Sequence, residues 1–141
     1  MKAIFTVLFL GLILCGCSRK QATNDYPKNS WAFAGYTSPD SALETWIWAF
    51  SKGDKTDMLQ SLTFESQKEW EVHLAGETDA QMQAQAAKAM TGVLGYTIQK
   101  RETNSDDDII ISISINGIGQ EMKMELKKIG NDWKVAGPKN D

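Results

Sequence analysis

The change of hydrophobic period after Gly92 limits the possible folds more than any other feature of the sequence. Before Gly92, apolar residues recur every three or four positions, which predicts amphipathic helices. After it, apolar and polar residues alternate, which predicts strands. The alternation is clearest in the isoleucines Ile109, Ile111, Ile113 and Ile115, which are separated by polar residues. Several helices followed by several strands indicate an α+β domain.

The first predicted helix has clear signals at both ends. Ser38 suits the N-cap, Pro39 the first helical position, and Gly53 a left-handed terminator. Leu43, Trp46, Ile47 and Phe50 form its apolar stripe. Three further helices are predicted: one capped by Asp54, one around residues 65–75, and one over residues 79–90 that is poor in large apolar residues and should pack shallowly.

The second half of the sequence predicts four strands. The first covers residues 94–103, and the isoleucine strand follows a polar turn. Asn116-Gly117 is a hairpin signal. The third strand carries Met122, Met124 and Leu126 on one face, and the last carries Trp133 and Val135 before Pro138 ends it. The sequence therefore predicts a curved four-stranded antiparallel sheet with the N-terminal helices packed on one face.

The N-terminus resembles a bacterial lipoprotein signal. Residues 3–14 are almost entirely apolar, too short to cross about 30 Å of hydrocarbon but suited to a signal peptide. The following Leu14-Cys15-Gly16-Cys17 is similar to the lipobox, although Cys15 departs from its usual small residue. The resemblance implies cleavage between Gly16 and Cys17 and a diacylglycerol on Cys17.

A plain secretory signal and a buried N-terminal helix are the alternatives. The cysteine argues against the first, and the abrupt polar tract that begins at Ser18 argues against the second. An anchor at Cys17 would make the membrane a partner and place the protein outside the cytoplasm. Because Ser18 rather than Asp follows the cysteine, the resemblance implies the periplasmic face of the outer membrane if the bacterium is Gram-negative.

An aromatic segment separates the polar tether from the predicted helices. Trp31, Phe33 and Tyr36 fall within six residues, too apolar for a free linker, so we expect them to dock on their own domain; contact with a partner is the alternative. The sequence thus divides into a signal peptide (1–16), a lipidated cysteine and tether with the aromatic segment (17–37), and a globular domain (38–141).

Charge and cysteine content exclude several classes. Without Lys2, 14 basic residues oppose 18 acidic ones, a net charge of −4 for residues 17–141, and no basic cluster favours nucleic acid. Cys15 leaves with the signal and Cys17 is the predicted lipid attachment site, so no disulfide is expected. His73 is the only histidine, so no zinc cluster is available. The sequence indicates neither a metal nor another cofactor.

The domain resembles the NTF2-like α+β cone, in particular small bacterial lipoproteins of unknown function. The resemblance covers about residues 38–137 and is carried by Ser38-Pro39-Asp40 with Ala42, Lys52-Gly53-Asp54 and Asp132-Trp133-Lys134-Val135. It implies a pocket between helices and concave sheet, which some members use for isomerase or dehydratase chemistry and others only for binding. The candidate lining residues, each of which fits plain core as well, are Trp46, Trp70, Tyr96, Met122 and Met124.

No catalytic set can be assembled from the sequence. His73 lies in Glu71-Val72-His73-Leu74 on an amphipathic helix and is expected at the surface. Asp106-Asp107-Asp108 lacks the spacing of a calcium loop and is expected to be a solvated turn. The sequence favours a lipid-anchored extracytoplasmic module that binds a small ligand or an envelope protein. Its alternatives are a proton-transfer enzyme with an apolar pocket and His73 as base, or a structural interaction protein.

Overall fold

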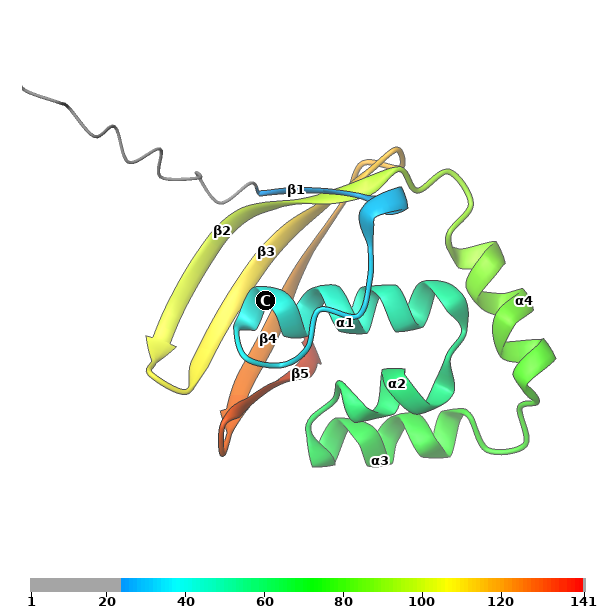
Figure 1. Ribbon diagram of the computed structural model, residues 1–141, viewed down its shortest axis with the longest axis horizontal. Coiled ribbons are helices and arrows are strands. Elements are labelled where there is room, and N and C mark those ends of the chain that lie inside the picture. The colour runs from blue at the N-terminus through cyan, green and yellow to red at the C-terminus, as the bar shows by residue number, and fades with distance from the viewer. Residues whose placement is uncertain (1–23, 141) are drawn as a thin grey trace, which may run out of the picture.

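The computed structural model describes residues 24–140, an α+β domain in which helices pack on a curled five-stranded antiparallel half-barrel (Figure 1). The strands are β1 (Asp25–Pro27), β2 (Gly95–Ser105), β3 (Asp108–Asn116), β4 (Gln120–Ile129) and β5 (Asp132–Pro138), adjacent in chain order. The helices are the 3₁₀ turn η1 (Lys28–Ser30), α1 (Pro39–Lys52), α2 (Lys55–Gln60), α3 (Phe64–His73) and α4 (Asp79–Ala89). Figure 1 shows α1 lying across the sheet, with α4 near the C-terminal end of α1.

The predicted strand count of four was wrong, because β1 adds a fifth. β1 pairs antiparallel with the start of β2, Tyr26 opposite Tyr96, and the two rings stack with centroids 4.7 Å apart. The close approach needs Gly95, since a Cβ there would lie 2.6 Å from the Tyr26 carbonyl oxygen. The sequence assigned these residues to the polar tether because three residues are too few to show an alternation.

The isoleucine alternation is confirmed in β3. Ile109, Ile111 and Ile113 are buried, whereas Ser112 and Ser114 on the opposite face are partly exposed. Across the β3–β4 ladder the isoleucines pair with the apolar residues of β4: Ile109 with Leu126, Ile111 with Met124 and Ile113 with Met122. Such cross-strand pairs stabilise a sheet and build the continuous apolar face that the helices cover.

The predicted signals of α1 are confirmed at both ends. The Ser38 hydroxyl accepts a hydrogen bond from the Ser41 N–H at 3.1 Å, and Gly53 ends the helix with φ 65°. The predicted stripe divides in two. Leu43 and Ile47 are buried in the core against the sheet. Trp46 and Phe50 are only partly buried; both pack against a second cluster that includes Met82 of α4, and Trp46 also packs against the main core.

α4 packs shallowly, as its composition predicts. Met82 and Ala86 are its buried residues. It approaches the end of α1 so closely that a Cβ on Gly53 would lie 2.7 Å from the Gln83 Cα. This contact holds α4 beside α1, while its small side chains leave space between the two helices further along.

Two of the three aromatic residues of the segment dock on their own domain, as expected, whereas Phe33 is exposed. Trp31 and Tyr36 pack against the main core. The Ala34 N–H donates to the Thr45 hydroxyl at 3.0 Å, and this hydroxyl donates to the Gly35 carbonyl at 3.1 Å. These bonds satisfy the buried Thr45 side chain and fix the segment over α1.

Candidate functional site

An apolar groove opens between α1, α4 and the β3–β4 hairpin. The part of the groove that lies beside the β3–β4 hairpin is called the upper part and has a volume of about 240 Å³. α1 contributes Trp46, Ile47 and Phe50, the end of α4 and the following turn contribute Ala89, Met90 and Val93, the hairpin contributes Ile113, Ile115, Ile118, Gln120 and Met122, and the docked segment contributes Trp31. The lining is almost wholly hydrophobic, which is typical of sites for apolar ligands.

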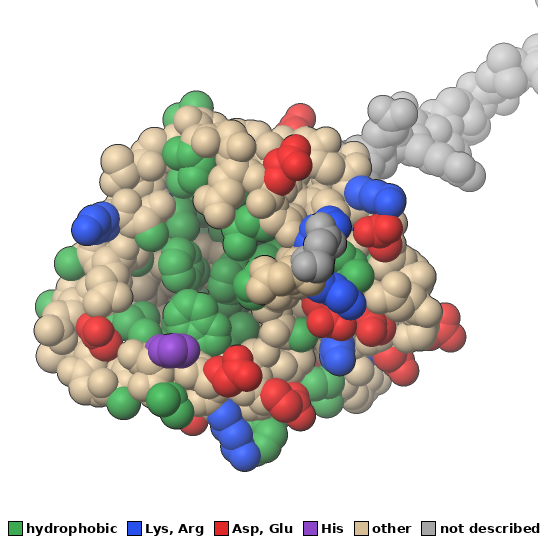
Figure 2. Space-filling view, turned by 180° about the vertical axis from the view of Figure 1, so that it is seen from behind, with side chains coloured by type: hydrophobic (Ala, Val, Ile, Leu, Met, Phe, Trp, Pro, Cys, Tyr) green, Lys and Arg blue, Asp and Glu red, His purple; other side chains and the backbone are tan. Residues whose placement is uncertain are grey.

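The groove continues into a lower part between the end of α1, α3 and α4. This part has a volume of about 260 Å³ and is lined by Gly53, Trp70, Leu74, Met82, Gln85 and Ala86. Phe50 and Ala89 line both parts, so the two parts adjoin at these residues. Figure 2 shows the resulting hollow, with hydrophobic side chains inside it and polar ones around it.

Aromatic rings form one wall of the groove. Trp46 and Phe50 stack with centroids 5.6 Å apart, and Phe50 meets the Trp70 ring edge-on at 6.5 Å. Aromatic pairs in such arrangements are worth about 0.5–1.5 kcal/mol beyond their buried area, so the rings stabilise one another in this wall. The opposite wall is lined by alanines of α4 together with Met82 and the C-cap residue Met90, and methionine side chains adapt readily to the shape of a ligand.

Few polar groups lie beside the groove, and those beside its upper part differ from those beside its lower part. Beside the upper part, the Lys28 ammonium donates to the Met90 carbonyl at 3.4 Å. In the lower part, the Gln85 amide donates to the Glu77 carboxylate at 3.0 Å. The Trp46 Nε1–H is buried and has no hydrogen-bond partner in the described chain, a state that usually costs about 1–3 kcal/mol.

The five candidate lining residues fall in three places. Trp46 and Met122 line the upper part of the groove, and Trp70 lines the lower part. Tyr96 and Met124 are fully buried in the core between α1 and the sheet. Gly16 and Cys17 lie outside the described residues.

The α4 wall was missed in the sequence. Met82, Ala86, Ala89 and Met90 recur at helical spacing, and this pattern is the signal that could have indicated an apolar face on the helix. Their small or unbranched side chains suggested shallow packing, but the pattern did not indicate that an open groove would result.

His73 is exposed at the end of α3, as expected. Figure 2 shows it at the rim of the hollow, and its neighbour Leu74 lines the lower part. Asp106 and Asp107 are exposed in the turn between β2 and β3. Among residues 24–140, no group of three or more His, Cys, Asp or Glu side chains is placed to hold a metal ion.

A cluster of ionisable residues joins the start of α1 to β1 and β2. The Arg101 guanidinium donates to both Asp40 carboxylate oxygens, at 3.1 and 2.6 Å, and these bonds raise the pKa of Arg101. Burial raises the pKa of Tyr26, and the Asp40 charge adds to this effect. Burial likewise raises the pKa values of Glu44 and Tyr96. The ion pair between Arg101 and Asp40 links α1 to the sheet. None of these ionisable residues lines the groove.

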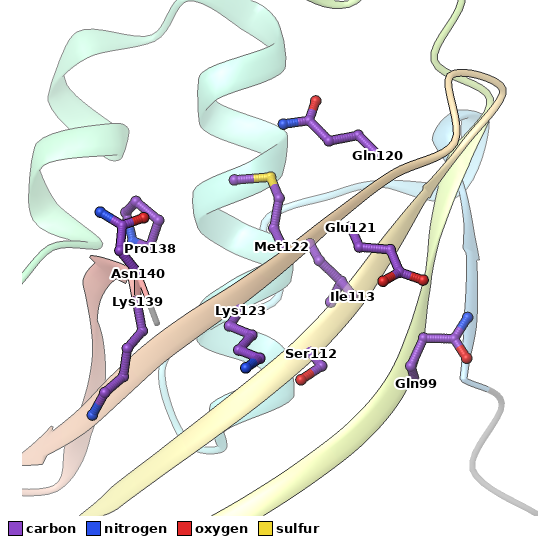
Figure 3. A pocket seen from close by; sticks show the side chains of 10 residues that line it. All are labelled: Gln99, Ser112, Ile113, Gln120, Glu121, Met122, Lys123, Pro138, Lys139 and Asn140. Atoms are coloured by element: carbon purple, nitrogen blue, oxygen red, sulfur yellow. The ribbon is translucent and has the colours of Figure 1, made fainter.

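A second depression of about 630 Å³ lies beside β4 and the C-terminal residues (Figure 3). It meets the upper groove at Ile113, Gln120 and Met122. Its other lining groups are polar: Gln99, Ser112, Glu121, Lys123 and the segment from Pro138 to Asn140. Because charges of both signs and amides line this depression, it offers a ligand less apolar surface than the groove does.

Within residues 24–140, no helix has the length and apolar character needed to span a bilayer. Comparisons with protein-family models, curated proteins and solved structures found no match for this chain. Its function is therefore inferred from its residues and from the geometry of the groove.

Proposed function

We propose that this protein is a lipid-anchored module of the bacterial cell envelope that binds an apolar ligand outside the cytoplasm and performs no catalysis. The observation that carries this proposal is the apolar groove with its two adjoining parts. Its two parts, of about 240 and 260 Å³, together fall in the range of known small-molecule sites, roughly 300–1,000 Å³. Aromatic, aliphatic and methionine side chains line it, so a ligand would gain free energy mainly by leaving water.

The anchor is supported by the segment from Leu14 to Cys17. Two or three acyl chains on Cys17 would hold the protein stably on its membrane, whereas a single chain binds only marginally. Cys17→Ser should abolish lipid labelling and release the protein from membranes or block its processing. Normal maturation and unchanged membrane retention of this variant would contradict the lipoprotein assignment.

We also propose that the domain is a cone of the NTF2-like type. Helices lie over the concave side of a curled antiparallel sheet, and the groove opens between helix and sheet. This is where the resemblance implies a pocket. Since one fold supports both binding and catalysis, the choice of binding rests on the lining residues. None of the described lining residues is an acid, a histidine or a cysteine.

Filling the groove at its centre tests the binding function. Ala89 is exposed and lines both parts, so Ala89→Trp should block the groove without disturbing the core. Ala87→Trp is the matched control, because Ala87 is exposed two positions away on α4 and does not line the groove. The full chain is reconstituted in lipid nanodiscs and titrated with dodecanol, while the methyl signals of ¹³C-labelled methionines are followed by NMR.

Dodecanol should shift the signals of Met82, Met90 and Met122 in the wild type and in Ala87→Trp, but not in Ala89→Trp. The buried Met58 and Met124 serve as internal references. Unshifted groove methionines in the wild type would contradict the proposed binding function. Equal shifts in the two tryptophan variants would show that dodecanol binds elsewhere.

A further inference from the structure

We infer that the groove holds a single-chain amphiphile of the fatty-acid type, with its alkyl chain between α1 and α4 and its carboxylate at Lys28. This inference rests on the proposed binding function and adds the ligand's class and orientation. It follows from three properties of the groove: its uncharged lining, its two adjoining parts, and the opposite charges beside its ends.

The lining excludes a ligand that is charged along its length. Among the described residues that line the two parts, none carries a charge, and the amides of Gln85 and Gln120 are the hydrogen-bonding side chains besides the Trp46 indole and the Trp31 and Trp70 rings. An ion placed there would lose its hydration without gaining a partner. The body of the ligand is therefore apolar, and any charge that it has must lie at an end.

The form of the groove suits one extended chain. Two parts of similar volume adjoin at Phe50 and Ala89, which line both. A flexible alkyl chain can pass from one part to the other, whereas a rigid ring system would fill one part only. Met82 in the lower part and Met90 and Met122 in the upper part are able to adapt to such a chain.

The charges beside the two ends determine the orientation. The ammonium of Lys28 lies 3.4 Å from the carbonyl of Met90, which lines the upper part, and Lys28 is exposed. At the lower part, the carboxylate of Glu77 holds the amide of Gln85. An anionic head is thus attracted to the upper end and repelled from the lower one, which places the tail toward Leu74 and Met82.

The test compares three probes that share one chain: dodecanoate, dodecanol and dodecylammonium. Each is titrated into the full chain in nanodiscs at a pH where dodecanoate is ionised, and empty nanodiscs give the correction for partitioning into lipid. Affinities are taken from the Met82, Met90 and Met122 methyl signals. An exposed ion pair typically contributes 0.2–1 kcal/mol, so dodecanoate should bind about 1.4-fold to fivefold more tightly than dodecanol.

Lys28→Gln should remove the preference for dodecanoate and leave the affinity for dodecanol unchanged. Lys128→Gln is the control, because it removes the same charge from an exposed site at the far end of β4, where the Lys128 N–H bonds the Asp107 carbonyl. This variant should retain the preference.

Each other outcome has a distinct meaning. Equal affinities for dodecanoate and dodecanol in the wild type would overturn the inference and leave the binding function intact. Tightest binding of dodecylammonium would overturn the orientation, and an equal effect of the Lys28 and Lys128 substitutions would overturn the role of Lys28. Unshifted groove methionines with all three probes would overturn the binding function itself.

Discussion

Replacement of Gly53 by alanine tests the contact that sets the distance between α1 and α4. Gly53 ends α1 with φ 65°, a conformation that L-residues rarely adopt. Its position also lies against the backbone of α4: a Cβ would be 2.7 Å from the Gln83 Cα and 2.8 Å from the Gln83 nitrogen. Since backbone cannot rotate aside as a side-chain tip can, α4 as a whole would have to move.

The expected loss has two parts. A left-handed conformation with a Cβ costs about 1–2 kcal/mol. Displacement of well-packed backbone adds about 1–3 kcal/mol, so Gly53→Ala should lower the free energy of unfolding by about 2–5 kcal/mol. Gly76→Ala separates the two parts, because Gly76 has φ 82° but no atom within 4 Å of its Cβ position. That variant should lose about 1–2 kcal/mol.

Urea denaturation followed by tryptophan fluorescence measures both losses. The groove offers a second measurement, since Gly53 lines its lower part. Movement of α4 should therefore shift the Met82 methyl signal in Gly53→Ala but not in Gly76→Ala. Equal destabilisation by the two variants would refute the close packing of α4 on the end of α1, and with it this account of how the lower groove is held open.

Three further predictions concern the sheet, the histidine and a partly buried acid. Ile113→Asp should cost several kcal/mol in urea denaturation because it buries an unpaired carboxylate, whereas Ser112→Asp on the outer face should cost far less; equal losses would mean that the register is misassigned. His73→Gln should change stability by about 0.5 kcal/mol or less and should complement a deletion strain at matched expression, since a catalytic base would lose about 10²–10⁴ in rate. Burial raises the pKa of Glu44, so its neutral form stabilises the fold at low pH, and this contribution is lost as the pH rises through the raised pKa. The stability of Glu44→Gln relative to wild type should therefore increase from about pH 4 to about pH 7. A constant difference between the two proteins would contradict the raised pKa of Glu44.

The features that the sequence predicted correctly are those with local causes. Ser38 caps α1 through its own side chain, and Gly53 ends the helix through its own backbone angle. The isoleucines of β3 alternate because successive side chains of any strand point to opposite faces. Each of these signals lies within a few residues of the structure it specifies, so a single sequence is sufficient to reveal it.

β1 has no such local signal. Its three residues are exposed or partly exposed, and no pattern distinguishes them from the polar tract before them. They form a strand because they pair with an edge of β2 some 70 residues later in the sequence. The missing side chain at Gly95 allows the close approach, and the ring of Tyr96 stacks on that of Tyr26. A strand specified by its partner can be identified only when the partner's position is known.

The groove escaped prediction for a related reason. Four of the residues on α1 formed one apolar stripe in the sequence, but Leu43 and Ile47 are buried in the core against the sheet, while Trp46 and Phe50 are only partly buried and line the groove. Whether the latter pair would be covered depends on the volume that α4 supplies, and α4 supplies alanines where leucines would have filled the space. The shallow packing predicted from its composition is thus the physical origin of the groove. α4 is held close to α1 at Gly53, but it carries too little apolar volume to close over the aromatic rings. An apolar surface therefore remains for a ligand to cover.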